Sequence, residues 1–482
     1  MSLVKEYKKI IRHSMVYGLG LALSQMVGFV MIPVYTRYLT PADYGVYELL
    51  ILTTKILTMF LTLGLSSATL RYYFEYENEE TKDKVISTAL IAALLISFAG
   101  ATSVNLFRNG LSWLCFDSYQ YVHYFTLVLF AMAFEIAMEI PLAYIRAKEL
   151  SHIFVFLIVS RLIVALSLNI LFVVYYELGL KGILLSNLIT ATIFGTGIIA
   201  YTFVKTTIGF SKKLFTQLFL YGWPLILSGF GFFVINSTDR FFLKHFLNLE
   251  EVGLYSLSVR FASVLSIVLL GPFWKMYGPY RFSIMKKDEA REIYANVQKI
   301  MLFVMLVCAL GMIVLSKDVL IILTPISFHG AYSAIPFLVL STVSLTCYYL
   351  FQTGIYLQKQ TKVISKLVSV AAVSSLTFNY LLIPHMGMVG AALAKFLTLF
   401  FLAVMTYVVS QKKYKIHYDH KSNFIIVILA LITWFLSTLV LFDNIWLRMF
   451  MKCGVLIVYV MVMCRFLFGT LDKIRLMFSP GH

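Results

Sequence analysis

Long apolar stretches alternate with short polar connectors along almost the whole chain. The first two stretches, near residues 12–31 and 44–70, each match or exceed the about 20 residues that cross the hydrocarbon core of a bilayer. The connector between them is too short to hold a domain, so the pair is predicted to be a transmembrane helical hairpin. Twelve further stretches follow near residues 84–105, 119–145, 152–175, 180–203, 214–237, 251–273, 292–315, 331–355, 363–382, 387–410, 423–442 and 446–468.

The first hairpin recurs later in the chain. The pairs that match at an offset of 208 residues are Leu39 with Leu247, Gly45 with Gly253, Tyr47 with Tyr255 and Gly182 with Gly390. Agreement on one offset at distant places indicates an internal duplication. Because each repeat has six spans, both enter the membrane in the same direction, as parallel repeats do. We expect lobes at 1–208 and 209–416, followed by an extra hairpin and a cytoplasmic tail at 417–482.

Composition supports the class that the pattern predicts. Hydrophobic residues make up 60% of the chain and charged residues only 13%, whereas a soluble protein has about 25% charged residues. The apolar runs are continuous rather than alternating, which excludes a transmembrane β-barrel. The prediction is an all-α polytopic membrane protein with about fourteen transmembrane helices.

The basic residues predict the orientation. If the N-terminus is cytoplasmic, 28 of the 40 Lys and Arg residues fall in cytoplasmic segments and eight in external ones. Because positive charge accumulates on the cytoplasmic side, both termini are expected inside the cell. The net charge of +17 lies in loops, where it contacts anionic lipid headgroups. No soluble basic domain is present to bind nucleic acid.

Six charged residues fall within the predicted spans. Each costs about 2.5–3.5 kcal/mol to insert at a helix centre, so most must face the bundle interior, a wet cavity or one another. These residues are Lys55, Glu135, Glu139, Arg161, Arg260 and Lys395.

Lys55 and Arg260 occupy nearly equivalent positions in the two repeats. The 208-residue offset places Arg260 opposite Leu52, one helical turn from Lys55. Two cations at such positions predict a cavity for an anion, because arginine holds phosphate oxygens bidentately and lysine adds a mobile charge. The alternative is that Lys55 pairs with Glu48 and that Arg260 extends outward to the headgroups.

Glu135 and Glu139 are one helical turn apart in the fourth span, and Arg161 enters the fifth span from the same side. An ion pair between Glu135 and Arg161 is one interpretation. The other is a carboxylate that couples transport to H+ or Na+, since burial raises a carboxyl pKa.

Two further arginines are candidates for anion contact at the ends of spans. Arg37 lies in the first external turn beside Asp43, and the two side chains could instead pair with each other. Arg71 ends the second span at the inner face, where positive-inside anchoring explains it equally well. The second external turn carries Asp239 and Arg240, which are expected to pair and to contact headgroups.

Motifs for other chemistries are missing from the sequence. It has no phosphate-cradling glycine loop with its lysine, no paired-histidine zinc motif and no large external loop for a glycan polymerase. The five cysteines show no spacing typical of disulfide or metal sites. We therefore expect a protein that is not an enzyme and that has no metal, no resident cofactor and no catalytic residues.

Three segments resemble a known family. They are residues 33–47 (PVYTRYLTPADYGVY), residues 239–255, which contain DRFFL and VGLY, and residues 387–392 (GMVGAA). They are similar to the Wzx-type lipid-linked oligosaccharide flippases of the multidrug/oligosaccharidyl-lipid/polysaccharide exporter superfamily. The resemblance covers about residues 10–410.

The resemblance implies two six-helix lobes in a V, open alternately to either side of the bacterial cytoplasmic membrane. It implies that the diphosphate of an undecaprenyl-linked oligosaccharide, from O-antigen, capsule or a related polymer, enters a cationic cavity lined by helices 1, 2, 7 and 8. Lys55, Arg260 and Arg71 fall on those helices. Membrane lipids, the polymerase and the export machinery are the implied partners. A flippase for the lipid-linked peptidoglycan precursor and a drug/cation antiporter of the same superfamily are the alternatives.

Overall fold

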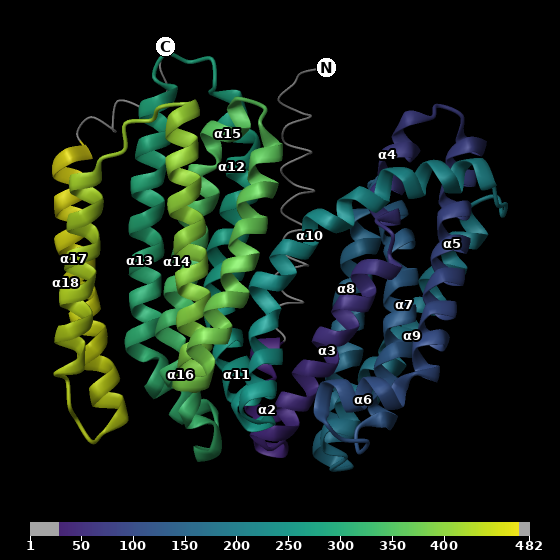
Figure 1. Cartoon of the computed structure of the whole chain (residues 1–482), viewed down its shortest axis with the longest axis horizontal. Helices are drawn as coiled ribbons and strands as arrows, with labels where there is room; N and C mark the ends of the chain where they lie inside the picture. Colours follow the sequence, from purple (N-terminus) through teal and green to yellow (C-terminus); the bar gives the residue numbers. More distant parts are fainter. Residues whose placement is uncertain (1–27, 472–482) are drawn as a thin grey trace. The chain divides into compact units, whose positions relative to one another are not determined.

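The structure is a computed structural model and describes residues 28–471, in which all regular structure is helical (Figure 1). The helices before residue 250 are α2 (Ile32–Tyr38), α3 (Pro41–Leu61), α4 (Leu65–Glu75), α5 (Glu79–Leu106), α6 (Arg108–Phe116), α7 (Val122–Ala147), α8 (Ser151–Asn169), the π-helical η1 (Ile170–Tyr175), α9 (Gly179–Lys205), α10 (Lys212–Phe246) and the start of α11 (Leu249–Leu265). Those that follow are the π-helical η2 (Ser266–Leu270), α12 (Gly271–Ser283), α13 (Ala290–Leu323), the 3-10 helix η3 (Ile326–Ser333), α14 (Ile335–Phe351), α15 (Thr353–Leu357), α16 (Thr361–Lys413), α17 (His420–Thr438) and α18 (Ile445–Leu471).

Within the described range, eleven helices are long and apolar enough to cross a membrane, or twelve when the bent α10 is counted as one span. This confirms the predicted all-α polytopic class. The long α16 contains two helices that meet at Gly387, where φ is +57°, and these match the predicted spans 363–382 and 387–410. The predicted first span lies almost wholly outside the described residues, so the count of fourteen stays a prediction.

Local sequence fixes the start of α3. Thr40 accepts a hydrogen bond from the backbone N–H of Asp43, and the Asp43 carboxylate accepts one from the Thr40 N–H, which forms a capping box. Pro41 follows at the first helical position, where its missing N–H costs nothing. Asp43 thus caps the helix, while Arg37 is exposed.

The described residues up to Leu257 form one compact unit together with Ala372–Ala391. At its centre α7 packs between α5 and α9, and α3, α4 and α8 also contact α7. Buried apolar side chains from these helices, among them Ile86, Leu90 and Tyr144, fill the core. This helical bundle holds the polar pocket described below.

Ser258–Ala371 and the residues from Ala392 onward form the second compact unit. In this unit α13 packs against α14, α17 and α18, and α17 and α18 lie side by side (Figure 1). Asp318 of α13 is fully buried and accepts hydrogen bonds from Arg448 Nε and Lys452 Nζ of α18, both at 2.7 Å. These contacts fasten α18 to the rest of the unit. The predicted domain boundaries at 208 and 416 stay predictions.

Candidate functional site

A polar pocket of about 320 Å³ opens inside the first unit. Four membrane-spanning helices contribute to its wall: α3, α7, α8 and α9. The polar lining residues are Thr54, Lys55, Thr58, Glu135, Arg161, Asn187 and Thr190, and the apolar ones are Ile51, Val128, Ala131, Met132, Ala165 and Leu184. The charged members come from near the middle of their helices, where a lipid-facing charge would be costly. The pocket brings these charged side chains together, away from lipid.

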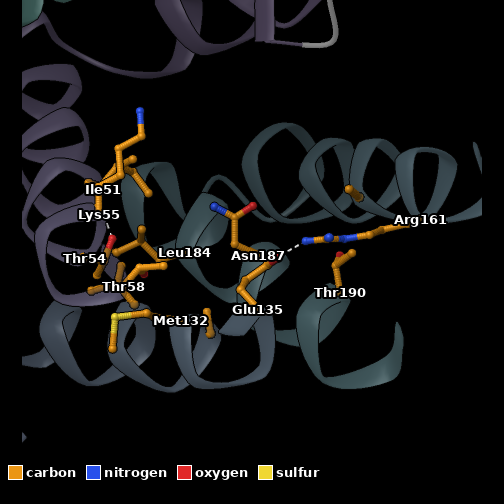
Figure 2. A pocket seen from close by; sticks show the side chains of 13 residues that line it. Ile51, Thr54, Lys55, Thr58, Met132, Glu135, Arg161, Leu184, Asn187 and Thr190 are labelled. Carbon is orange, nitrogen blue, oxygen red and sulfur yellow. Dashed lines mark hydrogen bonds and ion pairs between the residues drawn. The ribbon is translucent and has the colours of Figure 1, made fainter. Parts of the chain in front are cut away.

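Glu135 and Arg161 meet across α7 and α8 at one side of this pocket. An Arg161 Nη donates to Glu135 Oε1, as the dashed line in Figure 2 shows. Their side chains are 43% and 33% exposed, so the pair faces the pocket and is not sealed in the core. The expected contact between these two residues is thus present. Whether Glu135 also couples transport to an ion stays a prediction.

Lys55 comes from α3 and lines the same pocket, a neighbourhood that no sequence pattern predicts. Its side chain extends away from the Glu135–Arg161 pair (Figure 2). The Lys55 side chain interacts electrostatically with Glu48 and with Arg240, so the alternative pairing with Glu48 stays open. The pocket lining therefore contains one lysine ammonium and one Glu135–Arg161 ion pair.

Two uncharged polar side chains of α9 complete the lining. Thr190 is 3% exposed, and its hydroxyl has no hydrogen-bond partner in the described part of the chain. Asn187 lies one turn earlier and its amide is also without a partner there. In Figure 2 Asn187 lies between Lys55 and Arg161. Neither residue was singled out from sequence, because lone hydroxyls and amides in membrane helices usually bond to neighbouring helices.

The other predicted site residues lie elsewhere. Arg71 is exposed, contacts Glu75 at 3.7 Å and lies 5.2 Å from the centre of the Tyr221 ring. Glu139 is half-buried on α7 and is not part of the pocket lining. Arg260 is half-buried on α11, in the second unit. A shared anion site of Lys55 and Arg260 stays a prediction, as do the roles of Arg37, Arg71 and Glu139.

One cluster differs from its expected role. Asp239 and Arg240 do pair, at 3.0 Å, but their side chains are only 2% and 7% exposed, so they do not reach lipid headgroups. The Tyr255 hydroxyl donates to Asp239 at 2.5 Å, and Arg240 also donates to the Asn236 carbonyl. The sequence placed this pair in an external turn, whereas α10 continues to Phe246 and carries it into the protein. The pair therefore packs α10 against α11.

No group of three or more His, Cys, Asp or Glu residues suited to a metal ion occurs within residues 28–471. The polar pocket instead offers an ammonium, an ion pair, an amide and hydroxyls. Such groups bind and orient a polar or anionic ligand through hydrogen bonds.

Comparison with known proteins shows two curated relatives from Haemophilus influenzae. The Lsg locus protein 1 is 24% identical over 408 residues, covering 80% of this chain and 95% of the relative. A membrane protein without an assigned function is 25% identical over 402 residues, covering 79% of this chain and 94% of the relative.

Solved structures show the fold. The lipid II flippase MurJ, in an inward closed conformation, superposes with a TM-score of 0.75 at 16% identity, over 94% of this chain and all of that one. A multidrug resistance transporter of the MATE family, in the MOP superfamily, superposes with a TM-score of 0.65 at 15% identity, over 80% of this chain and 94% of that one. The chain therefore has the fold that these transporters share.

The family follows from a longer sequence match. A family model described as "Polysaccharide biosynthesis protein" matches residues 10–285, more than half of the 482-residue chain. This multi-pass helical membrane protein therefore belongs to the polysaccharide biosynthesis protein family.

Proposed function

We propose that the protein is a flippase that moves an undecaprenyl-diphosphate-linked oligosaccharide from the cytoplasmic to the outer leaflet of the bacterial cytoplasmic membrane. The observation that carries the proposal is the polar pocket with Lys55 in its lining, built inside a bundle of membrane-spanning helices. Membership of a polysaccharide biosynthesis family supports a saccharide cargo, and the shared fold is that of a lipid II flippase and of a multidrug resistance transporter.

The physical problem for such a protein is the charge of the cargo. Two negative charges of a diphosphate must leave the headgroup region and cross a medium that barely solvates them. Lipid cannot supply compensating charge at that depth, so the protein must. Lys55 and Arg260, from helices of different repeats, are the proposed cations, with Arg71 and Arg37 nearer the two surfaces. Alternating access, in which the two lobes open first to one side and then to the other, then carries the diphosphate and its sugars across the membrane.

An ion gradient is the proposed energy source. Glu135 would couple transport if protonation released its contact with Arg161, and Glu139 lies one turn away. The partners proposed for the product are the polymerase and export machinery on the outer side, with both termini of the chain on the cytoplasmic side.

The proposal is tested in cells that lack the protein. With radiolabelled sugar supplied, lipid-linked oligosaccharide should accumulate in the inner leaflet, inaccessible to a glycosidase added to spheroplasts. Restoring the wild-type chain should return the label to the accessible side. Accumulation that is equally accessible with and without the protein would exclude the proposed direction of transport.

A second candidate is a flippase for the lipid-linked peptidoglycan precursor. The superposition on MurJ over 94% of this chain favours it. Rescue of cell-wall synthesis by this chain in cells depleted of their own lipid II flippase would support the second candidate over the first.

A further inference from the structure

We propose that Arg281, in the second unit, is the centre of a binding site for a phosphate group, supplied by the headgroup of an anionic phospholipid or by free phosphate. The site is built from other residues than the polar pocket of the first unit, and the inference does not rest on the proposed function. The experiment below distinguishes the two sources of the phosphate.

Arg281 is a buried cation without an anionic partner. It lies in the last turn of α12 and is 5% exposed. Within residues 28–471 its Nε and one Nη have no hydrogen-bond partner, and it forms no salt bridge with a carboxylate. Its largest electrostatic interactions are with the phenols of Tyr356, Tyr277 and Tyr294. Because a guanidinium stays ionised in proteins and a buried charge without a counter-charge is costly, the site calls for an anion.

Aromatic rings of α12 and α15 surround the guanidinium, and the two helices lie at the same end of this unit (Figure 1). The Arg281 Cζ lies 4.0 Å from the centre of the Tyr356 ring, 4.8 Å from that of Phe282 and 5.0 Å from that of Trp274. The faces of such rings attract a cation, but they carry no formal charge that would balance it. The rings therefore orient the guanidinium and leave two of its nitrogens to donate to a ligand.

The cage has a fixed inner side and a movable outer side. The Tyr294 hydroxyl donates to the Arg281 carbonyl at 2.6 Å, and the Tyr277 hydroxyl lies 3.0 Å from the Thr353 hydroxyl. Phe282, in contrast, is 41% exposed. A rotation of this one ring gives a ligand access to the guanidinium, while the backbone of Arg281 stays in place.

The surroundings of the cage suit a lipid headgroup. The connector that follows α12 is predicted to be cytoplasmic, and the cytoplasmic leaflet carries the anionic lipids. Met276 and Tyr280 on α12 are exposed, and the exposed Lys286 and Lys287 follow the helix. Apolar and aromatic side chains followed by lysines are typical of the membrane–water interface. A phosphate there meets Arg281, whose planar fork matches phosphate oxygens.

The test is native mass spectrometry of the full-length protein released from detergent micelles. The probes are dioleoyl phosphatidylglycerol and dioleoylglycerol, which has the same chains and no phosphate. We expect the phospholipid to bind at least about tenfold more tightly, because the other lipid forms no charge-assisted hydrogen bond with Arg281. Equal binding of the two lipids would overturn the inference.

Competition with excess inorganic phosphate identifies the source of the group. Phosphatidylglycerol that stays bound supports the headgroup as the occupant of the site. Displacement of the lipid by inorganic phosphate supports the same phosphate site with free phosphate as its occupant.

Matched variants locate the phosphate. Arg281→Gln removes the caged charge, and Arg291→Gln makes the same change at an exposed arginine of α13, whose Cζ lies 5.1 Å from the centre of the Tyr414 ring. Arg281→Gln should weaken phosphatidylglycerol binding at least about tenfold. Arg291→Gln should weaken it no more than about twofold, because an exposed charge contributes little. Equal losses would show that the positive charge of this surface in general attracts the lipid, which would contradict a site at Arg281.

The melting temperature separates binding from a structural role. Because Arg281→Gln removes an unpaired buried charge, its melting temperature without added lipid should equal or exceed that of the wild type. Phosphatidylglycerol should raise the melting temperature of the wild type, as a ligand of the folded state does, but not that of Arg281→Gln.

Arg281→Lys keeps the charge without the planar fork and should retain part of the binding. It also tests the site if Arg281→Gln does not accumulate in the membrane. Phosphatidylglycerol binding that is unchanged in both variants would overturn the inference. None of these measurements requires transport, so a failure here leaves the proposed function standing, and a failure of leaflet exchange leaves this site standing.

Discussion

Gly45 of α3 and Gly253 of α11 lie against each other where the two helices cross. A Cβ built on Gly45 would lie 2.0 Å from the Leu249 carbonyl oxygen, and one built on Gly253 would lie 1.8 Å from the Pro41 carbonyl oxygen. These glycines are also a matched pair in the 208-residue repeat. The duplicated segments therefore contact each other through their equivalent positions, at a distance that only glycine permits.

Gly45→Ala and Gly253→Ala should each destabilise the protein, by about 1–3 kcal/mol, because the added methyl meets backbone that cannot rotate away. The measurement is the melting temperature in detergent. Gly197→Ala is the matched control, since its Cβ would meet nothing within 4 Å, and we expect it to be neutral or to stabilise by about 0.5–1 kcal/mol. A Gly45→Ala protein as stable as Gly197→Ala would contradict the crossing.

The Glu135–Arg161 contact predicts that a second substitution restores part of the stability that the first one removes. Glu135→Gln should reduce stability by leaving Arg161 without its partner, by about 1 kcal/mol because the pair is partly exposed to the pocket. The double variant Glu135→Gln/Arg161→Gln should recover part of that loss, as a double-mutant cycle measures. If the double variant loses as much as the two single changes together, the residues act independently, and a separate coupling role for Glu135 gains support.

The contacts of Asp318 indicate that this residue attaches the hairpin of α17 and α18 to α13. It is fully buried between Arg448 and Lys452, so Asp318→Asn leaves two cations without their counter-charge and should cost about 3–5 kcal/mol. The measurement is the melting temperature, together with protease cleavage between α17 and α18. Asp443→Asn, in the exposed loop of that hairpin, is the control and should change stability by no more than about 0.5 kcal/mol. Equal effects of the two changes would show that the buried carboxylate does not hold the hairpin.

The distribution of basic residues predicts the topology. Reporter fusions after Lys84, Lys213 and Lys415 should give cytoplasmic signals, and fusions near Phe116, Leu249 and Asp443 should give external ones. The reason is the excess of Lys and Arg in alternate loops. An external signal at Lys415 would contradict the fourteen-span topology.

Much of the fold was predictable because few kinds of backbone structure can cross a bilayer. Continuous apolar runs predicted the helices, and the 208-residue offset predicted which glycines are equivalent. The sequence did not show that α10 runs on to Phe246 and buries Asp239 and Arg240, because a polar pair at the end of a span usually marks a loop. Bends and helix ends depend on tertiary packing, which hydropathy does not report.

The candidate site was predictable only in part. The cost of intramembrane charge singled out Lys55, Glu135 and Arg161, and the helical spacing suggested that the last two meet. That Lys55 lines the same pocket depends on how α3 packs against α7 and α9, which no local pattern encodes. Asn187 and Thr190 were missed because their side chains resemble ordinary packing residues until their missing hydrogen bonds are seen.

The proposed cations predict a loss of transport without loss of protein. Lys55→Ala and Arg260→Ala should each reduce export at least about tenfold if each meets a charge of the cargo away from water, with normal amounts of protein in the membrane. Arg260→Lys should keep part of the activity, since its charge remains while the bidentate fork is lost. Wild-type export by a stably expressed double variant, Lys55→Ala/Arg260→Ala, would show that the substrate's charge is met by other residues.

The central claim is tested most directly with purified protein in liposomes that contain a fluorescent undecaprenyl-diphosphate oligosaccharide in both leaflets. A membrane-impermeant quencher of the label reports the fraction in the outer leaflet over time. We predict that wild-type protein makes almost all of the label accessible to the quencher, and that empty liposomes leave about half of it protected, as expected for label shared equally between two leaflets that do not exchange. A protected fraction that is the same with and without the protein, under an imposed proton or sodium gradient of either direction, would contradict the assignment as a flippase.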